Sequence, residues 1–125
     1  MKKKKMILII EDDKDISRTL CMRLEMENYE VLTASAGYEG FYKAITQGAD
    51  LIILDLKLPG LPGEEICKEI RKIEKFDSMP IIMLTAKDTD VDKIIGKVIG
   101  ANHYMNKPFD VDELLKKISL LLNGK

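Results

Sequence analysis

The chain has 125 residues, of which 46% are hydrophobic and 33% are charged. This length fits one domain, and the apolar content is sufficient for a core, which argues against disorder. The formal net charge of −1 gives no global signal for nucleic acid or membrane surfaces. The basic run at residues 2–5 precedes an apolar stretch too short for a signal peptide or a transmembrane helix. We therefore expect a single cytoplasmic domain over residues 1–125, without a membrane partner and without direct contact to nucleic acid.

Short apolar runs alternate with amphipathic stretches along the whole chain. This alternation is typical of strand–helix units that form a parallel sheet covered by helices on both faces. The third and fourth runs are nearly continuous in Ile and Leu, which is typical of central strands. The predicted strands are residues 6–10, 30–34, 51–54, 80–84 and 103–106.

Five amphipathic stretches predict helices between and after these strands. In the first, apolar residues recur at helical spacing between Ile16 and Glu27, and Asp13 or Asp15 suits the positive N-terminal end of the helix. The other helices are predicted at about residues 37–47, 63–73, 88–99 and 110–122. The breaks are turn-sized, so no linker is expected. Cys21 and Cys67 lack the spacing of a zinc site.

Acidic residues follow the first and third predicted strands. Glu11, Asp12 and Asp13 come after the first strand, and Asp55 comes directly after the third. Ligands of open parallel sheets bind beyond the carboxyl ends of the strands, where the strand order reverses. If these strands are neighbours, Glu11, Asp12 and Asp55 converge, and their like charges require a cation. Hard oxygen ligands in this number favour Mg²⁺. Asp13, taken alone, fits equally well as the N-cap of the next helix.

The fourth and fifth strands end in two further polar groups. Thr85 offers a hydroxyl and Lys107 offers an ammonium. Each has an ordinary explanation when taken alone, Thr85 as a hydroxyl bonded to backbone and Lys107 as a surface lysine. A carboxylate nucleophile, a divalent cation and a lysine are nevertheless the parts that phosphoryl transfer needs, because its catalysis is mostly positioning and charge neutralisation. The set as a whole predicts an aspartyl phosphate on Asp55.

In this order and at these separations, the residues resemble the receiver domains of bacterial two-component response regulators, including the chemotaxis receivers, over essentially the whole chain. The resemblance is carried by ILIIEDD at 7–13, LDLKLPG at 54–60, PIIMLTA at 80–86 and GANHYMNKPF at 100–109. It implies a doubly wound, flavodoxin-like (βα)5 fold of the α/β class, with five parallel strands in the order 2-1-3-4-5. It also implies a signalling switch rather than an enzyme, with self-catalysed phosphotransfer and autodephosphorylation only.

The same resemblance implies the roles of the acidic residues. Asp55 would accept the phosphoryl group. Mg²⁺, or Mn²⁺ in its place, would be bound by Asp12, Asp55 and the backbone carbonyl of Lys57, and Glu11 would act mainly through water.

The resemblance further implies how the site responds. Thr85 would move to bond a phosphoryl oxygen, Lys107 would pair with the phosphate, and Tyr104 would turn inward as the aromatic switch. The Lys107–Pro108 bond would be cis. The signal would leave through the fourth helix, fifth strand and fifth helix.

Lys57 and Lys87 stand at two positions that vary within the family. Both would overhang the pocket, and our hypothesis is that they change the lifetime of the phosphate by pairing with it or by crowding the hydrolytic water. The alternative is that both are solvent-exposed lysines without effect.

The implied partners are a sensor histidine kinase or phosphotransfer protein and a downstream effector or output domain. Residues 91–96 and 113–115 partly resemble the winged-helix transcription-factor subclass, which implies a phosphorylation-dependent homodimer. Lys93, Glu113 and Lys117 match that subclass, whereas acids are replaced by Val98, Asn102 and His103. The chain is expected to be a stand-alone receiver or the N-terminal domain of a DNA-binding regulator.

Three alternatives compete with this interpretation. A phosphohydrolase of the haloacid dehalogenase type needs a second acid two residues after its nucleophile, where this chain has Lys57. A flavin- or nucleotide-binding protein needs a phosphate-cradling loop after the first strand, where residues 11–13 would repel phosphate. An unphosphorylated pseudo-receiver remains as a binding module, although all five key positions are intact.

Overall fold

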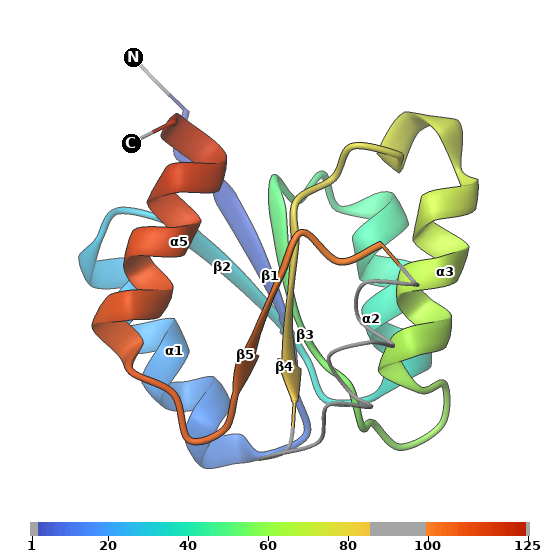
Figure 1. Ribbon diagram of the computed structural model, residues 1–125, viewed down its shortest axis with the longest axis horizontal. Helices are drawn as coiled ribbons and strands as arrows, with labels where there is room; N and C mark the ends of the chain where they lie inside the picture. The colour runs from blue at the N-terminus through green and yellow to red at the C-terminus, as the bar shows by residue number, and fades with distance from the viewer. Residues whose placement is uncertain (1–2, 86–99, 125) are drawn as a thin grey trace.

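The computed structural model describes residues 3–85 and 100–124 and contains a five-stranded parallel sheet (Figure 1). The strands lie in the order β2-β1-β3-β4-β5, which confirms the predicted order. The strands are β1 (Met6–Ile10), β2 (Glu30–Ala34), β3 (Leu51–Asp55), β4 (Ile81–Thr85) and β5 (His103–Asn106). The helices are α1 (Lys14–Met26), α2 (Gly37–Thr46), α3 (Gly63–Lys72), the short 3₁₀ helix η1 (Glu74–Phe76) and α5 (Val111–Asn123). The helix predicted at 88–99 lies outside the described residues.

Helices cover both faces of the sheet, with α1 and α5 on one side and α2 and α3 on the other (Figure 1). All five residues of β3 and of β4 are buried, as expected for strands with no solvent-facing side. Successive side chains of a strand point to opposite faces. Ile53 therefore packs with the α1 and α5 residues, whereas Ile52 and Leu54 pack with those of α2 and α3. The edge strands β2 and β5 are only partly buried.

Three strand boundaries and one element differ from the prediction. Asp55 belongs to β3 because it pairs with Leu84 and the ladder continues to Leu56, whose N–H donates to the Leu84 carbonyl. The fourth strand begins at Ile81 rather than at Pro80, since proline has no N–H to donate. It ends at Thr85 rather than at Leu84, because Thr85 still pairs with Asn106 of β5. The 3₁₀ helix η1 is a single short turn that apolar periodicity does not predict.

The loop between β1 and α1 is held by side-chain caps. Asp13 is the N-cap of α1, because its Oδ1 accepts from the N–H groups of Asp15 and Ile16 at 2.9 and 3.2 Å. Glu11 Oε2 in turn accepts from the Asp13 N–H at 3.0 Å. Asp13 therefore has a structural role here, and the cap fixes the path of the chain directly after Glu11.

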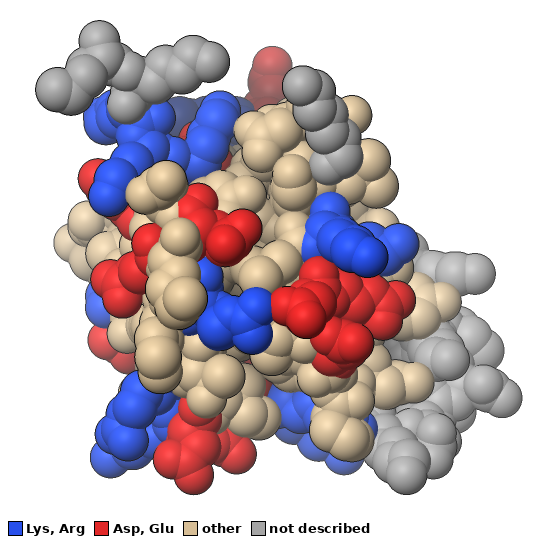
Figure 2. All heavy atoms as spheres, turned by 90° about the vertical axis from the view of Figure 1, so that its left-hand side faces the viewer, with Lys and Arg blue, Asp and Glu red and all other residues tan. Residues whose placement is uncertain are grey.

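The surface over α1 and α5 carries charges of both signs. Figure 2 faces this side and shows Lys and Arg interspersed with Asp and Glu, with other residues between them. Arg23 of α1 and Asp112 of α5 form one ion pair of this surface, with an N–O distance of 2.6 Å. Among the described residues, no helix is long and apolar enough to cross a membrane.

Candidate functional site

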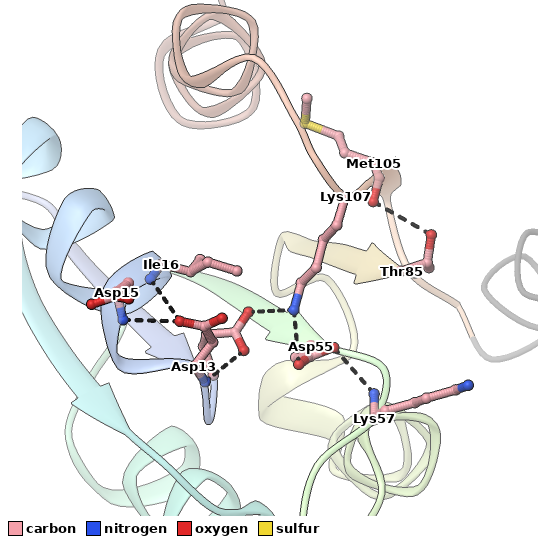
Figure 3. Close-up of polar contacts among 9 residues, drawn as sticks. Asp13, Asp15, Ile16, Asp55, Lys57, Thr85, Met105 and Lys107 are labelled. Atoms are coloured by element: carbon pink, nitrogen blue, oxygen red, sulfur yellow. Dashed lines mark hydrogen bonds and ion pairs between the residues drawn. The ribbon is translucent and has the colours of Figure 1, made fainter. Parts of the chain in front are cut away.

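Four strands deliver polar side chains to one edge of the sheet (Figure 3). Glu11 follows β1, Asp55 ends β3, Thr85 ends β4 and Lys107 follows β5. Because β1 and β3 are neighbours, and β4 and β5 continue the sheet beside β3, residues that are 22 to 96 positions apart in sequence meet here. The edge contains the switch point at which the chain passes from β1 and β2 to β3, where ligands of such sheets bind.

The three predicted carboxylates lie together. Glu11, Asp12 and Asp55 each place an oxygen within 4.8 Å of the others. Glu11 is 2% exposed and Asp55 is 5% exposed, whereas Asp12 is exposed. Two of the acids are therefore held inside the protein, and the third faces solvent at the mouth of the cluster.

Lys107 reaches into this acidic cluster. Its Nζ lies 2.8 Å from Glu11 Oε1 and 3.1 Å from Asp55 Oδ2. Three carboxylates and one ammonium leave two negative charges uncompensated when all groups are ionised. Glu11 Oε1 is buried, and its contact with Lys107 is an ion pair. No described residue forms a hydrogen bond with this oxygen. The cluster is thus short of positive charge at a place where water is largely excluded.

Burial and ion pairing shift the pKa values of Glu11 and Lys107 in this cluster. Burial raises the pKa of Glu11 to about 7, against the opposing effects of Lys107 and of the Asp13 N–H, and the neighbouring Asp55 raises that pKa further. Burial alone would lower the pKa of Lys107, but its bonds to Glu11 and Asp55 outweigh that effect and raise the pKa. A divalent cation bound by hard oxygens would relieve the excess negative charge, so the donor set fits Mg²⁺.

The loop after β3 fixes the Asp55 carboxylate. The Lys57 N–H donates to Asp55 Oδ1 at 3.2 Å. The Lys57 side chain is exposed and extends away from Asp55 (Figure 3). Gly63 lies so close behind this loop that a Cβ there would overlap the Asp55 carbonyl oxygen and the Leu56 backbone. Lys87 lies outside the described residues.

Thr85 and Tyr104 lie on the β4 and β5 side of the cluster. Thr85 is fully buried, and its hydroxyl donates to Asn106 Oδ1 at 2.8 Å, with the Met105 carbonyl at 3.5 Å. Tyr104 is half-buried against the core on the α2 and α3 side and stacks on His103, with ring centroids 6.3 Å apart. The Lys107–Pro108 bond is cis, as the resemblance implies.

Sequence reasoning missed Asn106, although it touches a predicted site residue. Its side chain is the partner of the Thr85 hydroxyl, and Thr85 and Asn106 are paired in the β4–β5 register. An amide directly before Lys107, opposite a buried threonine, was the available signal. That signal becomes readable only once β4 and β5 are known to be neighbours in this register.

Parallel strands in this order, with a carboxylate cluster and a lysine at the switch point, define a doubly wound, flavodoxin-like α/β protein whose carboxylate cluster is suited to a cation. A family model described as "Response regulator receiver domain" matches residues 7–119. The chain therefore belongs to the receiver domain family of two-component response regulators.

Individual relatives agree with this assignment. The chain is 47% identical over 116 residues to "Response regulator ArlR" of Staphylococcus aureus, and the match covers 93% of this chain and 52% of that protein. The chain thus spans about half the length of the curated relatives it matches. Among solved structures, a putative response regulator from Chloroflexus aurantiacus aligns with a TM-score of 0.91 and 35% identity, over 96% of this chain and 98% of the other.

A second solved structure bears on the metal. The receiver domain of a sensor histidine kinase from Pseudomonas aeruginosa aligns with a TM-score of 0.89 and 30% identity, over 98% of this chain and 100% of the other. That protein is described with a magnesium ion coordinated in its active-site cleft.

Proposed function

We propose that this domain, over residues 1–125, is a phosphorylation-activated switch that accepts a phosphoryl group on Asp55. The observation that carries the proposal is the convergence of Glu11, Asp12 and Asp55 on one another and of Lys107 on the two buried carboxylates. The domain acts in the cytoplasm, and its phosphoryl donor is a sensor histidine kinase or a phosphotransfer protein, whose phosphohistidine is the usual reactant of this family.

In the transfer step, a carboxylate oxygen of Asp55 attacks the phosphorus of the phosphohistidine. The new O–P bond forms as the P–N bond breaks, and the imidazole leaves with a proton from solvent. Lys107, already 3.1 Å from Asp55, pairs with the incoming phosphoryl oxygens. The Thr85 hydroxyl donates a hydrogen bond to one of these oxygens. Hydrolysis by water later releases inorganic phosphate and restores Asp55.

Asp12, Asp55 and the backbone carbonyl of Lys57 would hold Mg²⁺, or Mn²⁺ in its place, with Glu11 acting through water. The bound ion would neutralise charge on the transferred group. Lys57 and Lys87 adjust the phosphate lifetime. Autodephosphorylation rates of Lys57→Ala and Lys87→Ala equal to the wild-type rate would contradict that role.

The signal leaves through the surface of β5 and α5 and the residues that precede β5. Tyr104, half-buried at this surface, turns inward when Thr85 moves toward the phosphate. The recipient is an effector protein or an output domain, and a DNA-binding output would suit a phosphorylation-dependent homodimer. Glu113 and Lys117, which both act electrostatically on His103, belong to this surface.

Acetyl phosphate with Mg²⁺ tests the phosphoacceptor. Intact-mass spectrometry should show one added phosphoryl group on the wild type and none on Asp55→Asn. Asp13→Asn is the matched control, because Asp13 is a nearby acid that caps α1 and lies outside the carboxylate cluster. Equal labelling of Asp55→Asn and the wild type would refute the assignment. Sustained turnover of p-nitrophenyl phosphate would instead favour a phosphohydrolase.

A further inference from the structure

The hydroxyl of Thr85 already has a strong partner in this structure. It donates to Asn106 Oδ1 at 2.8 Å, while the Met105 carbonyl, at 3.5 Å, is too distant for a strong bond. Thr85 is fully buried, so water does not compete for the hydroxyl. In Figure 3 the hydroxyl is turned toward β5, on the side away from Asp55.

A threonine hydroxyl has one proton and can donate one strong hydrogen bond at a time. The proposed function requires that proton at a phosphoryl oxygen on Asp55, so the bond to Asn106 must break first. We propose that Asn106 is a positioning residue that latches Thr85 in its resting orientation and thereby restrains the switch. This inference rests on the proposed function and adds a residue to it.

The geometry of the strand pair favours a latch over an incidental contact. Thr85 and Asn106 are directly paired in the β4–β5 register, so two adjacent backbones hold both side chains in place. Asn106 also directly precedes Lys107, whose Nζ contacts Asp55. Asn106 and the phosphate-pairing Lys107 therefore share one short stretch of backbone. A movement of Lys107 toward the phosphate also moves Asn106.

The strength of the Thr85–Asn106 hydrogen bond sets how much its removal should change the binding of a phosphoryl mimic. A neutral hydrogen bond changes an equilibrium constant by about 2- to 10-fold. A ligand that binds only the released state has its apparent affinity reduced by the fraction of molecules that are released. Removing the latch should therefore tighten binding of a phosphoryl mimic by about 2- to 10-fold.

The experiment measures binding of beryllofluoride, a phosphoryl mimic that attaches to a carboxylate, in the presence of Mg²⁺. Asn106→Val removes the acceptor and suits a strand position. We expect it to bind the mimic about 2- to 10-fold more tightly than the wild type. In the Thr85→Ala background the hydroxyl is gone, so adding Asn106→Val should leave the affinity unchanged. A merely structural role of Asn106 would not depend on Thr85 in this way.

The outcomes separate the two proposals. A wild type that binds no beryllofluoride contradicts the proposed function, and the latch fails with it. A wild type that binds the mimic, with an Asn106→Val affinity that is unchanged or that changes equally in both backgrounds, overturns the latch alone. Should Asn106→Val not fold, the side-chain amide resonances of Asn106 in the wild type provide the measurement. They should shift when the mimic is added, and unmoved resonances overturn the latch.

Discussion

Arg71 on α3 joins three segments of the chain, and its replacement by alanine should destabilise the fold measurably. Its guanidinium donates twice to the Gly100 carbonyl, at 3.0 and 2.8 Å, and once to Asn102 Oδ1 at 2.9 Å. It also donates to the carbonyls of Phe76 and Asp77 at 3.2 and 3.3 Å. The side chain thus fixes the approach to β5, the strand that leads to Lys107.

The loss of stability in Arg71→Ala depends on how far water can replace these hydrogen bonds. A hydrogen bond that involves a charged group contributes about 1.5 to 3 kcal/mol to stability. Arg71 is half-buried and Asn102 is exposed, so water reaches part of the cluster. The contacts to Gly100 are part-buried and less replaceable. We expect Arg71→Ala to lower the free energy of unfolding by about 2 kcal/mol.

Equilibrium unfolding in urea, followed by circular dichroism, measures this loss. Arg23→Ala is the matched control, because Arg23 makes an exposed ion pair with Asp112, with side chains 38% and 74% exposed. Such pairs contribute about 0 to 1 kcal/mol. A loss of stability in Arg71→Ala no greater than that in Arg23→Ala, at an unchanged denaturant slope, would contradict this role of Arg71.

Three further predictions concern pH, loop packing and the core. Burial lowers the pKa of His103 from its ordinary value of 6.5. The contribution of His103 to stability is therefore present above pH 6.5 and is lost as the pH falls through the lower pKa of the folded protein. Between these two pKa values the urea midpoint of His103→Gln should depend less on pH than that of the wild type, and an equal pH dependence would contradict the assignment. Gly63→Ala should slow labelling by acetyl phosphate, because its Cβ displaces the Asp55 backbone; a wild-type labelling rate would argue against this packing. Leu54→Ala, at a fully buried position, should cost about 2 to 5 kcal/mol in urea unfolding, whereas the exposed Leu120→Ala should stay within about 0.5 kcal/mol.

Much of the sheet could be predicted from local sequence. Buried parallel strands are short, continuous Ile and Leu runs, and the runs ending at Ile10, Leu54 and Leu84 correspond to β1, β3 and β4. Apolar periodicity does not record which strands are neighbours, so the strand order came from the family resemblance. That order matters for the site, because only the pairing of β1 with β3 brings Glu11 to Asp55.

Side-chain bonds between distant segments could not be predicted in the same way. Thr85 and Asn106 are 21 residues apart, and Arg71 and Gly100 are 29 residues apart. Such contacts depend on strand register and on side-chain direction, which residue patterns do not contain. The burial of Glu11 likewise depends on Lys107, because the ion pair between them compensates part of the charge that burial would otherwise disfavour.

Locating the phosphoryl group tests most directly whether Asp55 is the phosphoacceptor. After labelling with acetyl phosphate and Mg²⁺, borohydride reduces an aspartyl phosphate to homoserine, and peptide mass spectrometry identifies the converted residue. We predict homoserine at position 55 of the wild type and a loss of conversion when Mg²⁺ is chelated before labelling. Conversion at Asp12 instead of Asp55, or labelling that survives chelation, would contradict a cation-dependent phosphoacceptor at Asp55.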